Sequence, residues 1–291
     1  SFKLYSDSSL SDLSYSLEKG TGEFVADRDY AKAMDLSHGI FTDSFHYLRA
    51  ERWGPRTSLP INSEEVRVHR QFGRDGEYTA YFIDEYGSES VTNKKLHHPN
   101  GKSTQLLQQT EAWLSEISPG ARLYTTSHEE LDLVSLQFAF ASAAAGETNH
   151  YRPTNVGFGI SYVLPIIVAA LSAKPGTMLL IENPEAHLHP RGQRKIAELL
   201  ARAASNDVQI IVETHSDHFL NGLRLSVHSG DVPTSNIQLH YFEREQTEYA
   251  IRAKITSPKI DKDGRIDFWP DGFFDENEKA LRELLRPSKK A

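Results

Sequence analysis

The sequence contains no cysteine, and this absence excludes several kinds of protein. Among its 291 residues, no thiol is available for a disulfide scaffold, a zinc ribbon or a thiol nucleophile. Disulfides are typical of oxidising compartments, so a cysteine-free chain fits a cytoplasmic protein, which is the location we expect. The longest apolar run, Tyr162 to Leu171, contains Pro165 and has about half the length that a bilayer requires. We therefore expect no membrane partner.

Basic side chains are fewer than acidic ones. The chain has 32 Lys and Arg against 40 Asp and Glu, a net charge of −8, which argues against sequence-blind binding of DNA over the whole surface. Nucleic acid stays a candidate partner through a local patch, since Arg49, Arg52 and Arg56 form either a basic strip or a solvated face. The chain starts at Ser1 without a Met or a signal-peptide pattern, so we expect it to be processed or cut from something longer.

The second half of the chain has an α/β pattern. Residues 177–181 and 208–212 are apolar runs typical of buried parallel strands, and residues 191–204 have the spacing of an amphipathic helix. Strand, helix and strand with short links predict a parallel sheet with flanking helices. Toward the C-terminus, residues 237–242 and 249–255 predict a further strand pair.

Two shorter patterns lie near the C-terminus. The cluster from Asp261 to Arg265 lacks the full ligand run of a calcium loop, so a hairpin turn is the better interpretation. Asp275 precedes a helical pattern that ends at Leu285, and its side chain is expected to cap that helix by accepting from the first free backbone amides.

Polar side chains follow both predicted parallel strands. Glu182 and Asn183 come directly after the first strand, and Glu213 and His215 follow the second. The carboxyl ends of parallel strands face the ligand crevice of an open sheet, so we expect Glu182 and His215 within reach of one ligand. A carboxylate that follows four apolar residues is costly to desolvate, which favours a functional role for Glu182 over a cap for a neighbouring segment.

Two glycines precede the apolar run at residues 162–171, which is itself expected to be a helix. In the stretch from Gly157 to Ser161 they would leave backbone N–H groups free at the helix N-terminus, where the helix dipole favours an anion such as phosphate. A turn that needs glycine for its backbone angles explains the same pattern. The motif alone does not decide between the two interpretations.

Three segments together resemble a known family. They are Gly157 to Ser161, Leu179 to Pro190 and Glu213 to Ser216. In this order they resemble the C-terminal half of an ABC-type ATPase of the SMC/RecF/OLD kind, and most closely its prokaryotic AAA-labelled branch. That branch ends in a Trp-Pro-x-Gly-Phe-Phe stretch, here Trp269 to Phe274, and Tyr47 to Arg56 is similar to a second landmark of it.

The resemblance implies a P-loop NTPase fold. This would be an ABC/SMC head-like parallel sheet with flanking helices and a helical arm or lid insertion. It implies a remainder of the N-terminal ATPase lobe over residues 1–60, the helical arm or lid over residues 61–150, and the C-terminal lobe over residues 151–291. Apolar residues at helical spacing between Leu106 and Ile117 fit the arm.

The resemblance also implies roles for single residues. Glu182 falls on the Walker B carboxylate, which holds Mg²⁺ through water. Asn183 stands where most relatives carry the catalytic glutamate that activates the attacking water, so ATP hydrolysis is expected to be weak. Glu185 is the nearest carboxylate that could substitute, and His215 matches the switch histidine that contacts the γ-phosphate.

A second group of residues is expected to act across a dimer. Gly157, Gly159 and Ser161 match the signature loop, which reads the ATP of the opposite subunit. Residues 186–189 occupy the dimer-contact loop. We therefore expect a homodimer or higher homo-oligomer that associates through its ATPase heads around ATP and Mg²⁺.

The resulting hypothesis is an ATPase that controls a partner effector such as a nuclease, because relatives of this branch are often encoded beside effectors in prokaryotic anti-phage defence loci. One alternative is a non-hydrolysing nucleotide-sensing scaffold, in which Asn183 marks lost catalysis. A third interpretation is a metal-dependent hydrolase that uses His187, His189, His215 and His218, with Glu185 and Asp217, as ligands.

The phosphate loop of such an ATPase has no match in this sequence. The single Gly-Lys-Ser-Thr run, from Gly101 to Thr104, has Leu96 where a P-loop requires glycine, and no buried strand precedes it. Lys102 is therefore predicted to be a surface loop residue. In the resembled family the P-loop lies N-terminal to a segment like residues 1–60, so either the chain is the C-terminal part of a longer protein or its nucleotide pocket is incomplete.

Overall fold

The structure is a computed structural model that describes residues 2–6, 9–13, 15–17, 24–26, 42–142, 144, 146–246 and 251–286. The chain forms two compact units, residues 1–42 and residues 43–291. In the first unit, β1 (Phe2–Ser6) pairs with β2 (Ser9–Leu13) and β3 (Tyr15–Leu17) pairs with β4 (Phe24–Ala26), both antiparallel.

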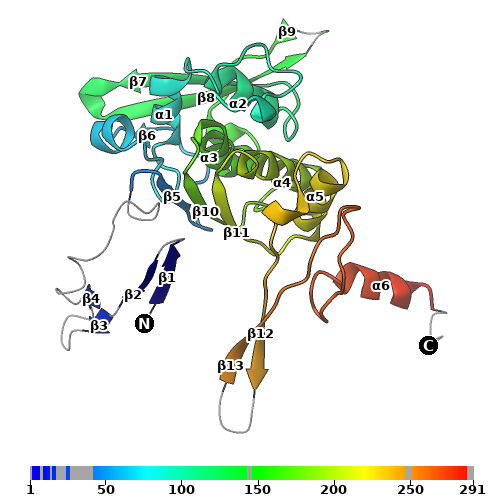
Figure 1. Cartoon of the computed structure of the whole chain (residues 1–291). Helices are drawn as coiled ribbons and strands as arrows, with labels where there is room; N and C mark the ends of the chain where they lie inside the picture. The colour runs from blue at the N-terminus through cyan, green and yellow to red at the C-terminus, as the bar shows by residue number, and fades with distance from the viewer. Residues whose placement is uncertain are drawn as a thin grey trace. The chain divides into compact units, whose positions relative to one another are not determined.

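The second unit mixes helices and strands along the chain (Figure 1). Its strands are β5 (Phe45–Leu48), β6 (Leu59–Pro60), β7 (Ala121–His128), β8 (Leu133–Ser142), β9 (Gly146–Glu147), β10 (Met178–Glu182), β11 (Gln209–Glu213), β12 (Tyr241–Gln246) and β13 (Ile251–Thr256). Its α-helices are α1 (Thr79–Tyr86), α2 (Leu106–Leu114), α3 (Phe158–Ser172), α4 (Pro190–Ala204), α5 (Asp217–His228) and α6 (Glu276–Leu284). Short helical turns are η2 (Glu64–Val68), η3 (Lys94–Leu96), η4 (Glu129–Leu131), η5 (Pro153–Asn155) and η6 (Thr234–Asn236).

A parallel sheet in the order β11-β10-β5 contains the strands predicted at residues 177–181 and 208–212. Along β10, Leu179 and Ile181 are only 1% exposed, because this face of the sheet lies beneath α3 and α4 (Figure 1). The mixed α/β fold with a parallel sheet and flanking helices is thus confirmed. Helix α4 begins with a proline, whose fixed φ suits the first helical position.

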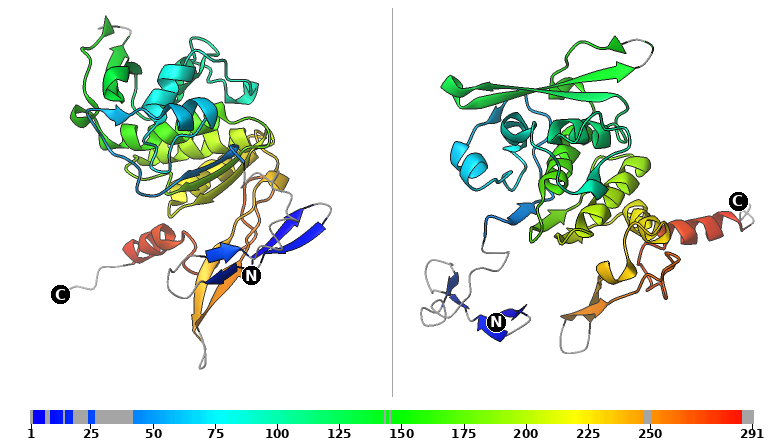
Figure 2. Two further views of the ribbon diagram at one scale, coloured as in Figure 1. Left: turned by 90° about the vertical axis from the view of Figure 1, so that its left-hand side faces the viewer. Right: turned by 45° about the horizontal axis from the view of Figure 1, so that its top comes forward.

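An antiparallel sheet, β6-β8-β7, forms a second layer with α1 and α2 beneath it (Figure 2). Strands β7 and β8 pair over eight positions, from Ala121 with Phe140 to His128 with Leu133. The helical spacing predicted at residues 106–117 corresponds to α2, whereas the strands β7 and β8 in the same segment were not predicted. Alternating apolar residues along β8 face the core, so burial of one sheet face stabilises these strands.

One apolar core joins the two layers. Helix α3 crosses its centre, where Ile166, Ile167 and Val168 are fully buried, and it is apolar on nearly all sides, as expected for a helix with neighbours all around it. Trp113 from α2 and Phe138 from β8 pack into the same cluster. The described residues of the layers thus share a single core, while the assignment of residues 1–60, 61–150 and 151–291 to functional parts stays a prediction.

The C-terminal predictions had mixed outcomes. Strands β12 and β13 form the expected antiparallel pair, and residues 247–250 of its turn lie outside the described residues. The cluster at Asp261–Arg265 is a hairpin turn, in which Asp261 Oδ1 accepts from the backbone amides of Asp263 and Arg265. Asp275 does occupy the N-cap position of α6, but its carboxylate accepts from the Gly272 amide and pairs with Lys279, so the expected cap bond was wrong.

None of the helices in the described part of the chain combines the length and the apolar character needed to cross a bilayer.

Helices α4 and α5 approach so closely that the contact requires a glycine. A Cβ atom added at Gly222 would lie 2.7 Å from the Arg194 carbonyl oxygen and 2.6 Å from Ala197 Cβ. We predict that Gly222→Ala lowers the free energy of unfolding by about 1–3 kcal/mol through overpacking, although alanine is the better helix former. Urea denaturation measures this loss. Leu225→Ala, which truncates a half-exposed residue of the same helix, is the control and should change stability little.

Candidate functional site

Glu182, the last residue of β10, is held by two hydrogen bonds. The Tyr47 hydroxyl donates to Oε1 at 2.7 Å and the Ala50 backbone N–H donates to Oε2 at 2.9 Å. Both bonds favour the ionised carboxylate and lower the pKa of Glu182, with the Tyr47 bond the larger cause. The side chain therefore stays negative at neutral pH. Glu182 caps the segment after β5 through the Ala50 amide, as the interpretation of a cap for a neighbouring segment expected. Its negative charge lies at the carboxyl end of the sheet.

The buried side chain of Arg52 fixes the backbone around Glu182. Its guanidinium donates to four carbonyl oxygens, those of Tyr162 at 3.0 Å, Arg49 at 2.7 Å, Glu182 at 2.6 Å and Asn183 at 2.7 Å. The residue is only 2% exposed, and burial lowers its pKa to about 10, so it remains charged. The end of β10 is thus connected to β5 and α3 through one buried cation.

The basic strip of three arginines does not exist. Arg52 is buried, Arg49 pairs with Asp75 through an Nε–Oδ1 contact of 2.7 Å, and the Arg56 guanidinium lies over the Trp53 ring at 4.8 Å. Neither the strip nor the solvated face describes Arg52, whose work is structural. The sequence pattern could not separate these cases, because nothing in it marks which arginine points inward.

The loop after β10 has an unusual backbone. Asn183 has φ of +40° and His187 has φ of +62°, a left-handed conformation that asparagine tolerates better than most other side chains. The Asn183 N–H donates to the Glu213 carbonyl at 3.0 Å and lies 3.3 Å from Glu213 Oε2. The conformation is a physical reason for asparagine at a position where the resemblance led us to expect glutamate.

His215 and Glu185 meet at the same end of the sheet. The His215 backbone N–H donates to Glu185 Oε1 at 2.8 Å, whereas Glu185 Oε2 is buried and has no hydrogen-bond partner among the described residues. The imidazole of His215 is 84% exposed, and its Nε2 lies 2.9 Å from Glu213 Oε1. Glu182, Asn183, Glu185 and His215 are thus gathered as the strand topology predicts.

Glu213 was not given a role by the sequence analysis. It contacts both the Asn183 amide and the His215 ring, and so connects the ends of β10 and β11. Its place as the last residue of a buried strand, equivalent to that of Glu182 in register, is the signal that would have identified it. Tyr47 and Arg52 carried no comparable signal, since their partners lie more than 100 residues away.

Of the two glycines at the start of α3, Gly159 is required by a close contact. Gly157 occupies the N-cap position, and a Cβ atom at Gly159 would lie 2.5 Å from the His187 carbonyl oxygen. The start of α3 therefore packs directly against the loop after β10. Ser161 Oγ is buried without a hydrogen-bond partner among the described residues, beside Trp53 and Gly54.

These residues line two separate cavities. One, of about 930 Å³, is lined by Glu182, Glu213 and His215. The other, of about 590 Å³, is lined by Gly157, Gly159 and the His187–His189 segment. The carboxylates and the glycines thus face different spaces of the same molecule.

A metal centre built from the histidines finds no support. Within the described ranges, no group of three or more His, Cys, Asp or Glu is placed to hold a metal ion. His187 packs on the rings of Phe158 and Tyr162, and His218 lies 3.7 Å from Asp217. His189 is the N-cap residue of α4 but makes no side-chain cap bond.

Lys102 is a surface residue, as the sequence predicted. It is exposed in the loop between η3 and α2, so no buried strand precedes the Gly-Lys-Ser-Thr run. The prediction of a surface loop residue is confirmed. Among the described residues, this run does not lie between a strand and a helix, as the phosphate-binding loop of a P-loop NTPase does.

Removal of the buried guanidinium tests the connection at the sheet end. We predict that Arg52→Met lowers the free energy of unfolding by about 3 kcal/mol or more, because each buried carbonyl left without a donor costs about 1–3 kcal/mol. Thermal or urea unfolding measures the change. Arg56→Met is the matched control and should cost less than about 1 kcal/mol, since its cation–π contact with Trp53 is exposed. Equal effects of the two variants would contradict the assigned role.

Comparisons with known proteins agree with the resemblance. Residues 145–221 match the family model described as "AAA domain, putative AbiEii toxin, Type IV TA system". Residues 232–284 match the model of a protein of unknown function, DUF3696. No curated protein matches the chain.

Three solved structures of SMC proteins show low similarity. One, from work on ATP-driven dimerisation and DNA-stimulated activation of SMC ATPases, is 13% identical with a TM-score of 0.38, and the match covers 72% of this chain and 99% of that one. An Smc head bound to the C-winged helix domain of ScpA is 12% identical with a TM-score of 0.35, with coverages of 52% and 42%. An Smc head with coiled coil and joint from Pyrococcus yayanosii is 14% identical with a TM-score of 0.34, with coverages of 62% and 29%.

The chain spans less than half the length of the last two structures, and similarity at this level carries no argument about function. The family models are the informative result, because they cover the segments that carry the resembling motifs. Residues 145–221 match this AAA domain model, and the match to the DUF3696 model follows in the chain.

Proposed function

We propose that this chain is part of an ABC/SMC-like ATPase head, which binds and hydrolyses ATP between two associated heads. The observation that carries the proposal is the ionised Glu182 at the end of β10, held by Tyr47 and the Ala50 amide beside the exposed His215 at the end of β11. A fixed negative charge and an imidazole at the carboxyl ends of adjacent parallel strands suit phosphoryl transfer, which depends on positioning and on charge stabilisation.

The two cavities favour a shared site between copies. Glu182 and His215 face one space, while Gly157 and Gly159 face another. A ligand bound at one set therefore does not reach the other within the same cavity. In the proposed head-to-head dimer, the start of α3 at Gly157 and Gly159 of one subunit reads the nucleotide held by the opposite subunit, which would account for the separation of the two sets.

The phosphate loop is proposed to come from outside the described residues. Strand β11 is an edge of its sheet, and the cavity of about 930 Å³ is lined by Ile210 and Val212 from one face of this strand and by Ile211 and Glu213 from the other. That open edge can accept another parallel strand. Such a strand would end at the same side as Glu182 and His215, where its following loop would meet the phosphates of ATP.

Mg²⁺ fits this site through water. Glu182 keeps its charge, and each of its oxygens has a lone pair left after one hydrogen bond. A bound Mg²⁺ would neutralise phosphate charge. Glu182 would orient a water molecule bound to Mg²⁺. The exposed His215 ring would donate a hydrogen bond to the terminal phosphate of ATP. Glu185, whose Oε1 accepts from the His215 backbone N–H, is proposed to take up a proton from the attacking water.

The biological role is proposed from the family description. Its mention of a type IV toxin–antitoxin system fits an ATPase that controls an effector such as a nuclease in prokaryotic anti-phage defence. The fold alone does not specify such a role. We further propose that the protein acts in the cytoplasm, as its lack of cysteine suggests.

Turnover by the intact assembly tests the site. We predict that Glu182→Gln and His215→Ala each lower phosphate release from ATP at least about 100-fold, the usual effect of removing one group that stabilises transition-state charge. His218→Ala is the control and should keep near wild-type turnover, because among the described residues this neighbouring histidine pairs only with Asp217. Unchanged turnover in His215→Ala would disprove the assigned role.

Asn183 favours a second candidate, a non-hydrolysing nucleotide-sensing scaffold, because its amide is no base. The discriminating change is Asn183→Glu, measured as phosphate release by the intact assembly. Strong activation from a near-zero baseline would support the scaffold. If the protein is an ATPase, we predict no gain in turnover and a loss of about 1–2 kcal/mol of stability, because glutamate is strained at a φ of +40°.

Asn183→Gly serves as the backbone control for this experiment. Glycine accepts the left-handed conformation without strain and adds no carboxylate. Stability close to the wild type in Asn183→Gly, together with a loss in Asn183→Glu, would show that the backbone selects the residue at this position.

A further inference from the structure

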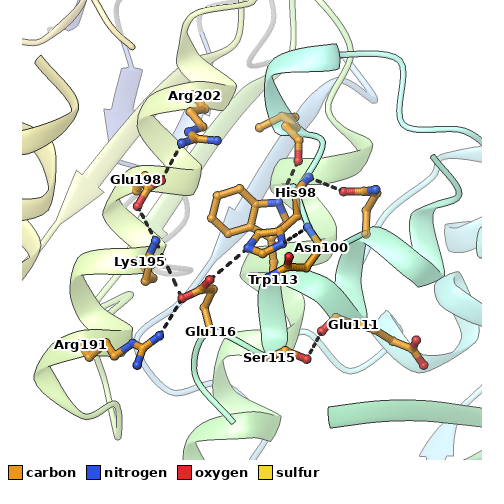
Figure 3. A network of polar contacts seen from close by, with 12 residues as sticks. His98, Asn100, Glu111, Trp113, Ser115, Glu116, Arg191, Lys195, Glu198 and Arg202 are labelled. Atoms are coloured by element: carbon orange, nitrogen blue, oxygen red, sulfur yellow. Dashed lines mark hydrogen bonds and ion pairs between the residues drawn. The ribbon is translucent and has the colours of Figure 1, made fainter. Parts of the chain in front are cut away.

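A group of ion pairs joins the end of α2 to the first half of α4 (Figure 3). At its centre is Glu116, just after α2, whose side chain is 16% exposed. Its Oε2 lies 3.2 Å from Arg191 Nη2 and 3.8 Å from Lys195 Nζ, and its Oε1 lies 3.2 Å from His98 Nε2. One carboxylate thus contacts three donors from two separate segments of the chain.

The α2 side of this contact is rigid. The Asn100 N–H donates to His98 Nδ1 at 3.2 Å, so Nδ1 is the acceptor and Nε2 carries the hydrogen that points to Glu116. The His98 N–H donates to the Gln109 side chain at 2.7 Å, and its ring packs edge-on against Trp113. The position of the Glu116 carboxylate is therefore set by the residues 98–116 segment.

The α4 side leads to the candidate site. Gln193, in the first turn of α4, donates to the Leu188 carbonyl at 2.8 Å and accepts from the Ser216 hydroxyl at 2.5 Å. Leu188 belongs to the loop after β10, and Ser216 directly follows His215. Arg191 and Lys195, the partners of Glu116, come from the same first turns of this helix. The helix start thus contacts Glu116 on one side and both site loops on the other.

We propose that Glu116 is a positioning residue, through which the segment of residues 98–119 sets the place of the 186–189 loop and of the His215 loop. This inference rests on the proposed function and deepens it, because it gives the inserted segment a part in head association. Loss of the Glu116 charge leaves Arg191 and Lys195 without their shared acceptor. The first turn of α4, and with it the two loops, is then free to shift.

Hydrogen exchange on the full natural chain tests the coupling directly. Glu116→Gln is expected to speed amide exchange in residues 186–193 and 215–217 by about three- to thirtyfold, the usual range for changes along a coupled network. The matched control is Glu198→Gln, which removes a carboxylate of the same network and helix that pairs with Lys195 and Arg202 but not with residues 98–119. It should leave exchange in both loops unchanged.

Turnover of the intact assembly provides the functional test. Glu116→Gln is expected to raise the assembly concentration for half-maximal phosphate release by about three- to thirtyfold, with the maximal rate per active dimer unchanged. A purely structural role would lower both activity and thermal stability in the two variants alike. Equal behaviour of Glu116→Gln and Glu198→Gln, or no change in either, would overturn the proposal.

The two experiments separate the two ideas. If the wild-type assembly releases no phosphate, the proposed ATPase function fails. The exchange measurement on the chain still decides whether Glu116 positions the loops.

Discussion

The buried guanidinium of Arg52 is the interaction on which the rest of the site depends. It binds the carbonyl oxygens of Glu182 and Asn183 at the end of β10, of Arg49 after β5 and of Tyr162 in α3. Carbonyl groups that leave a strand end must find donors or remain exposed to water. A single planar cation with several N–H groups provides them and keeps three elements in register.

In this arrangement the site residues are positioned by hydrogen bonds rather than by apolar packing of their side chains. Arg52 holds the carbonyl groups of Glu182 and Asn183, while Tyr47 and the Ala50 amide hold the Glu182 carboxylate. Farther along, the left-handed residues Asn183 and His187 turn the loop back toward α3. Gly159 admits the His187 carbonyl there, since any Cβ would collide with it. The loop conformation is thus specified at both ends and in the middle.

Much of this architecture could be predicted from the sequence. Apolar runs that end in carboxylates predicted β10 and β11, because hydrophobic patterns are local signals in the sequence. The parallel arrangement of these strands then predicted that Glu182 lies near His215. Residues 61–150 were harder. The alternation of Val134, Leu136 and Phe138 along β8 is a strand signal, but helical spacing around Trp113 dominated the interpretation of that segment.

Single side-chain contacts between residues distant in sequence were not predicted. Arg52 was grouped with exposed arginines, and Glu116 was not singled out, because most partners of each residue lie more than 70 residues away in sequence. Asn183 was interpreted as a lost catalytic glutamate, whereas the structure adds a backbone reason for asparagine there. A residue type is informative about chemistry only after its backbone conformation is known.

The open edge of β11 has a practical consequence for handling the protein. In the described part of the sheet, β11 is an edge strand with a half-exposed Ile211 at its centre, and such an edge is a template for pairing with another extended chain. Only the outer residues Gln209 and Glu213 offer polar protection. If the proposed further strand pairs with this edge, the chain produced without that strand would be prone to self-association, and co-expression with it would raise solubility.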